Sequence, residues 1–78
     1  MEAIEVTARW DSTGRVEPLR FNAGGAPAEV EATGRQWVDA AGLHVLVQAH
    51  AGRTFELIFD PRELLWRLGF EGKPQVFA

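Results

Sequence analysis

Hydrophobic and polar residues alternate from the start of the chain. In residues 4–10, IEVTARW, the even positions are apolar and the odd positions are polar, and this period of two predicts a half-buried β-strand. Residues 11–14, DSTG, predict a turn, because Asp bonds its own backbone and Gly accepts a positive φ. The next predicted strand, residues 15–22, contains Pro18, which has no N–H to donate and therefore indicates a bulge or an edge position.

A glycine-rich loop and a second turn bound the third predicted strand. Residues 22–27, NAGGAP, are the strongest loop signal in the chain, and residues 28–38, AEVEATGRQWV, follow as a strand. Residues 39–42, DAAG, repeat the D-x-x-G pattern of the first turn. The length of this second turn decides the place of Trp37. A four-residue loop sets it beside His44, and a three-residue loop sets it on the apolar face of the next strand.

Residues 42–60, GLHVLVQAHAGRTFELIFD, predict a β-hairpin whose register follows from its two faces. A three-residue loop at 50–52, with Gly52 in the left-handed conformation, brings apolar residues opposite one another, whereas a two-residue loop mixes polar and apolar residues. Because a slip of one residue turns every side chain to the other face, we expect the register with one clean apolar face. Its pairs are Val47 with Phe55, Val45 with Leu57, and Leu43 with Phe59.

Residues 61–68 predict a short helix that packs on the sheet. Asp60 is suited to the N-cap and Pro61 to the first helical position, and Glu63 completes a capping box. Gly69 is suited to end the helix in the left-handed conformation. The apolar stripe that would face the sheet consists of Leu64, Leu65 and Leu68.

The predicted fold is mainly β, an α+β arrangement in which a five-stranded antiparallel meander is followed by one short C-terminal helix. One domain over residues 1–70 and a C-terminal tail at 71–78 are expected. A small curled barrel of the SH3-like or OB-like kind fits this order, and so does a half-open sheet capped by the helix. The chain of 78 residues is 46% hydrophobic and has no cysteine, so its core must come from apolar packing, aided by a subunit interface.

The charge of the chain disfavours one class of partner. A net charge of −3 lacks the basic excess that usually neutralises nucleic-acid phosphates. No apolar run is long enough to span a membrane, and the acidic, alternating N-terminus does not fit a signal peptide. The abundance of Arg over Lys, with many Ala and Gly residues, indicates a bacterial source with a GC-rich genome. We therefore expect a cytoplasmic bacterial protein.

The two histidines, His44 and His50, do not form one metal site. Six residues apart on a strand, they are separated by roughly 20 Å at about 3.3 Å per residue, which is too far for two ligands of one ion. The ordinary interpretation places both on a solvated face or in a loop. A metal shared across a dimer is the remaining alternative for a metal.

His44 also has a possible catalytic interpretation. In the expected register it faces Ile58, with Asp60 diagonal to it, and an Asp–His hydrogen bond orients imidazoles in acid–base catalysis. However, Asp60 is committed to the helix cap, and the single serine, Ser12, lies in another hairpin. The sequence therefore predicts no catalytic, cofactor-binding or metal-binding residue, and no cofactor.

Tryptophan and arginine side chains near the strand ends form a candidate interaction surface. Both residue types are enriched at protein–protein hot spots, and both stack on bases in single-strand binders. For Trp10 the core is the favoured alternative. Trp66 is expected off the apolar stripe of the helix, at the helix–sheet seam or facing a partner. The candidate residues are Arg9, Trp10, Arg15, Arg35, Trp37, His44 and Trp66.

The features that carry a family resemblance are Trp10-Asp11, Pro18, Phe21, the Gly24-Gly25 turn, Val30, Trp37 and the G-x-x-F-x-L run from Gly52 to Leu57. Over residues 4–66 this layout resembles a family of small, uncharacterised bacterial β-rich domains. It is also similar to a segment at the C-terminal end of some relatives of the Y-family translesion polymerases. The resemblance implies an accessory or protein-binding role and transfers no catalytic residue. The chain departs from the pattern at Ala23, Ala26 and Ala28, where a Trp, a basic residue and a Tyr are expected, which puts a binding surface there in doubt.

Three functions follow as hypotheses. The first is a non-enzymatic interaction module that forms a homodimer and binds protein through the tryptophan and arginine rim. The second is a small barrel that binds single-stranded nucleic acid. The third is a small ligand-binding or enzymatic subunit that uses His44.

Overall fold

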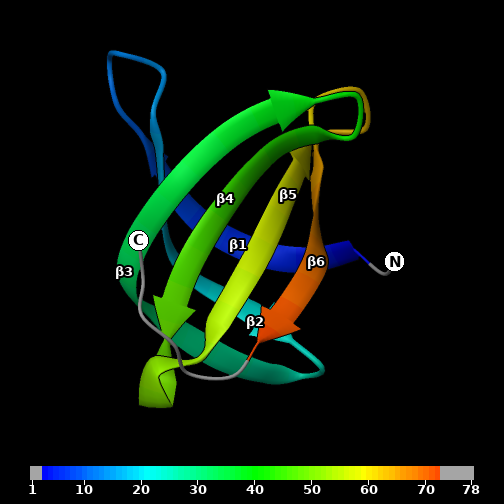
Figure 1. The fold of residues 1–78 in the computed structure, drawn as a ribbon. Helices are drawn as coiled ribbons and strands as arrows, with labels where there is room; N and C mark the ends of the chain where they lie inside the picture. The colour runs from blue at the N-terminus through cyan, green and yellow to red at the C-terminus, as the bar shows by residue number, and fades with distance from the viewer. Residues whose placement is uncertain (1–2, 73–78) are drawn as a thin grey trace.

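Residues 3–72 form a closed antiparallel β-barrel of six strands that follow one another in sequence order (Figure 1). The computed structural model describes residues 3–72. The strands are β1 (Ala3–Trp10), β2 (Val16–Ala23), β3 (Ala26–Asp39), β4 (Gly42–Ala49), β5 (Thr54–Asp60) and β6 (Leu65–Gly72), with a short 3-10 helix, η1 (His50–Gly52), after β4. The meander is confirmed, but the count of five strands is wrong. In the described part of the chain, no helix has the length and hydropathy needed to cross a membrane.

The β4–β5 hairpin has the predicted register. Val47 pairs with Phe55, Val45 with Leu57, and Leu43 with Phe59. The loop is the η1 segment, in which Gly52 has a φ of 72° and Ala51 a φ of 62°, so two consecutive residues are left-handed. The choice of the register with one clean apolar face is therefore confirmed.

The predicted helix over 61–68 is wrong, although its capping chemistry is present. The Asp60 side chain accepts hydrogen bonds from the backbone N–H groups of Arg62 (2.9 Å) and Glu63 (3.4 Å), and the Leu64 N–H donates to the Asp60 carbonyl (2.8 Å). One helical turn forms in this way. It ends at Leu64, whose φ of 56° is left-handed and directs the chain into a strand.

The strand β6 replaces the helix because it closes the barrel. It pairs with β5 on one side and with β1 on the other, so both strands gain a partner for their backbone groups. An isolated helix of eight residues is marginal and leaves those edges open. Trp66 is buried and Leu68 packs against the core, with Arg67 between them. Residues 71–72 of the predicted tail complete β6, and 73–78 lie outside the described residues.

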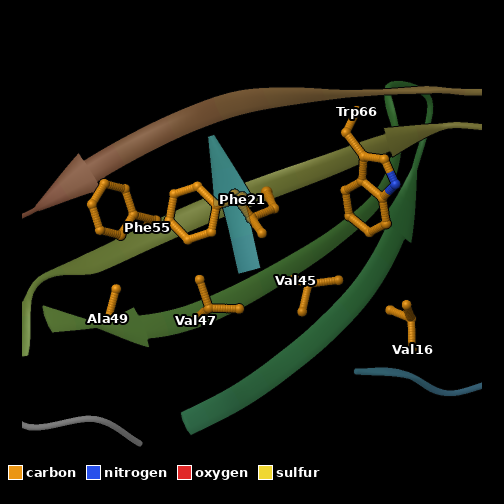
Figure 2. Close-up of a cluster of buried hydrophobic side chains, with 8 residues drawn as sticks. Val16, Phe21, Val45, Val47, Ala49, Phe55 and Trp66 are labelled. Atoms are coloured by element: carbon orange, nitrogen blue, oxygen red, sulfur yellow. The ribbon is translucent and has the colours of Figure 1, made fainter. Parts of the chain in front are cut away.

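The core fills the barrel with side chains from opposite walls (Figure 2). Phe21 of β2 meets Phe55 of β5 edge to face, with ring centroids 4.9 Å apart. Trp66 is 9% exposed and lies 5.3 Å from Phe59, so it belongs to the core and does not face a partner from a helix. The buried cluster consists of Val16, Phe21, Val45, Val47, Ala49, Phe55, Leu57 and Trp66.

Pro18 marks the place where β2 leaves β3. The β1–β2 register shifts beside Pro18, which confirms the predicted bulge. In the described strands, β2 pairs with β3 from Arg20 to Ala23, and a groove of about 470 Å³ opens beyond that segment. The Gln36 side chain bridges the far end of the groove, since its Nε2 donates to the Val16 carbonyl at 2.5 Å.

We expect Gly42→Ala to destabilise the barrel strongly. Gly42 has a φ of 134°, and an added Cβ would stand 2.1 Å from the carbonyl oxygen of Phe59. A loss of more than about 3 kcal/mol in the free energy of unfolding is expected by chemical denaturation. The matched control is Gly14→Ala, where φ is 87° but no atom lies within 4 Å, and about 1 kcal/mol is expected. Equal losses would contradict the steric explanation.

Candidate functional site

His44 lies on the outer wall of the barrel and is nevertheless buried. Its β4 neighbours, Leu43 and Val45, pack in and against the core, so alternation along the strand turns His44 outward. It is 7% exposed because the Trp37 ring of β3 stacks on it, with centroids 5.0 Å apart and planes 9° apart. The pairing of Asp39 with Gly42 gives the four-residue turn, the alternative that places Trp37 beside His44.

Two carboxylates hold the imidazole of His44 from the flanking strands. Its Nε2 lies 2.7 Å from Oδ1 of Asp39 on β3, and its Nδ1 is in hydrogen-bond contact with Oε2 of Glu56 on β5. Carboxylates only accept hydrogen bonds, whereas a neutral imidazole has a single N–H. Both contacts are hydrogen bonds only when both ring nitrogens carry a proton, so the geometry favours the imidazolium.

The electrostatics of the cluster agree with that protonation state. Burial acts to lower the pKa of His44, but the hydrogen bonds to Glu56 and Asp39, together with their charges, outweigh it and raise the pKa above 6.5. The hydrogen bond to His44 lowers the pKa of Asp39 below 3.8. Arg35 adds a cation to the stack, with its guanidinium carbon 5.2 Å from the centre of the Trp37 ring.

This arrangement differs from both interpretations of His44 drawn from the sequence. The expected solvated position is wrong, and the expected diagonal partner, Asp60, instead binds the turn that follows it and Arg67. His50 is exposed in η1, as a loop histidine is expected to be. In the described residues, no group of three or more His, Cys, Asp or Glu side chains is arranged to hold a metal ion.

The partners that sequence reasoning missed follow from the same register. Once His44 pairs with Ile58, its diagonal neighbours on β5 are Glu56 and Asp60, and only Asp60 was weighed. Asp39 lies two residues beyond Trp37, which pairs with His44, so it is the diagonal neighbour on β3. The diagonal position of each carboxylate relative to His44 can therefore be derived from the strand register.

A second cluster, here named the apolar mouth, lies at the inner face of one end of the barrel. Trp10 is 49% exposed and touches Phe59 edge to face at 5.6 Å, so it is not the core residue that was favoured. Val38 is 75% exposed and pairs with Leu43, which in turn pairs with Phe59. The apolar mouth consists of Trp10, Val38, Leu43 and Phe59, with Trp66 beneath Phe59.

The predicted rim is therefore divided between two faces. Arg35 and Trp37 join His44 on the outer wall, whereas Trp10 lies in the apolar mouth. Arg9 forms an exposed ion pair with Glu17. Arg15 donates to the carbonyl of Gly34 at 3.3 Å, near the seam between β2 and β3.

We expect the free energy of unfolding to fall as pH rises through the raised pKa of His44, above 6.5. The folded chain binds this proton more tightly than the unfolded chain does, so its stabilisation is complete below 6.5 and is lost above the folded pKa. Asp39 acts at the acid end, where its contribution is lost as pH falls through its lowered pKa, below 3.8. Chemical denaturation between pH 6 and pH 9 measures the His44 effect.

Two variants separate His44 from other titrating groups. His44→Gln should cost about 2 kcal/mol at pH 6, because charged hydrogen bonds are lost, and should remove most of the slope. His50→Gln, at the exposed histidine, should keep the wild-type slope. A slope that survives in His44→Gln would show that another group causes it.

Comparison of the chain with protein-family models, with curated proteins and with solved structures found no match. The resemblance over residues 4–66 thus stays a prediction from the sequence pattern.

Proposed function

We propose that the chain is a non-enzymatic protein-interaction module that self-associates through the apolar mouth. The observation that carries the proposal is Trp10, a ring that is half exposed and fixed against Phe59. Tryptophan is the residue type most enriched at interface hot spots, and contiguous exposed apolar groups mark interaction sites. Because Phe59 already orients the ring, binding would cost little side-chain entropy.

The partner that suits this surface is a second copy of the chain. A two-fold contact would place Trp10 of one copy against Val38 of the other, and the reverse, since both side chains are exposed and are linked through Phe59 and Leu43. A domain of 78 residues buries a modest fraction of its surface, so a shared interface adds apolar burial that the monomer lacks.

The charges at this end support close approach of two copies. Arg67 is bound by Asp60 and by Glu63, each at 3.1 Å, and Arg62 donates to the carbonyl of Ala40 at 3.4 Å. The two Arg67 bonds pair charges within the chain, and the Arg62 bond joins the β5–β6 turn to the β3–β4 turn. A rim of this kind is polar without a large excess of either sign, which suits the periphery of an interface.

The outer wall supports the non-enzymatic part of the proposal. In the imidazolium form, both ring nitrogens of His44 donate to carboxylates, so neither has a lone pair for a general base. The Trp37 ring already contacts Arg35 and His44, so a nucleic-acid base would have to displace a stacked partner. The setting that we propose, on the sequence features, is a bacterial cytoplasm, and the family resemblance is compatible with such an accessory role.

Sedimentation velocity from micromolar to submillimolar concentration tests the proposal. We expect a reversible dimer whose dissociation constant rises at least about 30-fold in Trp10→Ala, the effect of losing a hot-spot residue. Phe70→Ala is the matched control, because Phe70 has almost the same exposure, 47%, but pairs with Glu56 away from the mouth. A wild-type chain that stays monomeric throughout, or equal weakening in both variants, would contradict the proposal.

A further inference from the structure

We infer that association through the apolar mouth is gated by one proton, which His44 holds between Asp39 and Glu56, an inference that rests on the proposed self-association. The protonated ring fixes the β3–β4 turn and with it the exposed Val38. Loss of the proton releases the turn and weakens the contact between copies. The occupant of the site is unchanged, a second copy of the chain.

The number of N–H donors on the His44 ring decides whether both carboxylates can stay in place. Asp39 and Glu56 offer only acceptors to the two ring nitrogens, so the doubly protonated ring satisfies both and the neutral ring satisfies one. After deprotonation, one nitrogen lone pair faces a carboxylate oxygen at hydrogen-bond distance, which is repulsive. One of the two carboxylates must then move.

Asp39 is the carboxylate that moves. Its side chain is 52% exposed, whereas that of Glu56 is 20% exposed, so Asp39 can turn into water at little cost. The neutral imidazole then keeps its remaining N–H for Glu56. Loss of the proton therefore displaces the end of β3 and the β3–β4 turn, whereas the hydrogen bond to β5 is kept.

Asp39 is joined to the apolar mouth by short covalent and hydrogen-bonded steps. It directly follows Val38, and its Oδ1 also accepts from the N–H of Ala41 at 2.9 Å, so the same oxygen holds both the turn and His44. The turn ends at Gly42, whose close approach to the Phe59 carbonyl sets its position against the mouth. Movement of Asp39 therefore displaces Val38, which precedes it, and also Gly42, which lies against the carbonyl of Phe59.

The other charged groups near the ring do not replace His44 in this role. They are Arg35 and Asp39 on β3, Glu56 and Asp60 on β5, Glu63 in the turn before β6, and Arg67 on β6. Arg67 is bound by Asp60 and Glu63, and Arg35 lies over Trp37. Between pH 6 and pH 9, imidazole is the side chain that ordinarily changes charge. The raised pKa of His44 places that change above 6.5.

The first test is sedimentation velocity of the full chain at pH 6 and pH 8.5, at constant ionic strength. We expect the dissociation constant of the dimer to rise about five- to tenfold at the higher pH, a usual size for coupling between two sites. His44→Gln should remove the pH dependence, and His50→Gln should retain it. A constant that is the same at both pH values in the wild type, but still sensitive to Trp10→Ala, would overturn the gate and leave the mouth intact.

A second test does not depend on association or on a folded variant. In the wild-type chain, NMR can follow the ring protons of His44 and the backbone amide exchange of Val38 and Ala41. After correction for the intrinsic effect of pH, exchange should accelerate with the same midpoint as the ring. Unchanged protection would overturn the gate. If the chain is monomeric at both pH values, the proposed function and the gate on association both fail, and this measurement then tests only whether the His44 proton holds the β3–β4 turn.

Discussion

The pairing of β6 with both β5 and β1 is the constraint on which the rest of the structure depends. It sets Trp66 beneath Phe59, and Phe59 in turn supports the Trp10 ring. On the outer face, an added Cβ at Gly69 would lie 2.7 Å from Cδ1 of Ile58, so the glycine leaves room for that side chain. Ile58 pairs with His44, which links closure of the barrel to the outer wall as well. Both clusters therefore depend on one strand.

His44 joins three strands from outside, as the core joins them from inside. Its ring bonds Asp39 on β3 and Glu56 on β5, while Val45 beside it packs in the core. Burying an ion is costly unless it is paired, and here the imidazolium has a carboxylate at each nitrogen. Because the Asp39 side chain stays half exposed, the cluster avoids the full cost of burying all three ions. The bonds fix the position of the β3–β4 turn as much as they add stability.

Most of the fold up to residue 60 could be predicted because local signals and tertiary packing agree there. The register of the β4–β5 hairpin follows from alternation alone, and Pro18 marks the bulge between β1 and β2. After Asp60, the local sequence signals and the tertiary packing favour different structures. The cap and the leucine spacing favour a helix, and the first turn does form, but barrel closure requires a strand. No local pattern states that β1 and β5 need a partner, so the sixth strand could not be derived from the segment itself.

The candidate site was predicted in part for a related reason. The loop length that places Trp37 beside His44 was one of two alternatives, and the contact is found. The partners of His44 depend on the register of three strands at once, which the pattern of a single hairpin does not give. The exposure of Trp10 could be predicted only from where the barrel ends, because its even position in β1 is shared with core-facing residues. Alternation gives the face of a side chain but not its height along the barrel axis.

Closure of the barrel also bears on the proposed association. In the described strands, β6 pairs along β5 and with Ala3 and Ile4 of β1. Along the open part of the β2–β3 seam, Pro18 has no N–H to offer. Addition of a further strand at these paired edges is therefore disfavoured, and the proposed contact between copies is one of side chains. A strand ladder uses many equivalent backbone bonds and tolerates the loss of one. In the proposed dimer, the contact relies instead on a few exposed side chains such as Trp10 and Val38, whose positions matter individually. A surface of this kind can respond to a single proton because one displaced turn removes a large share of its contacts.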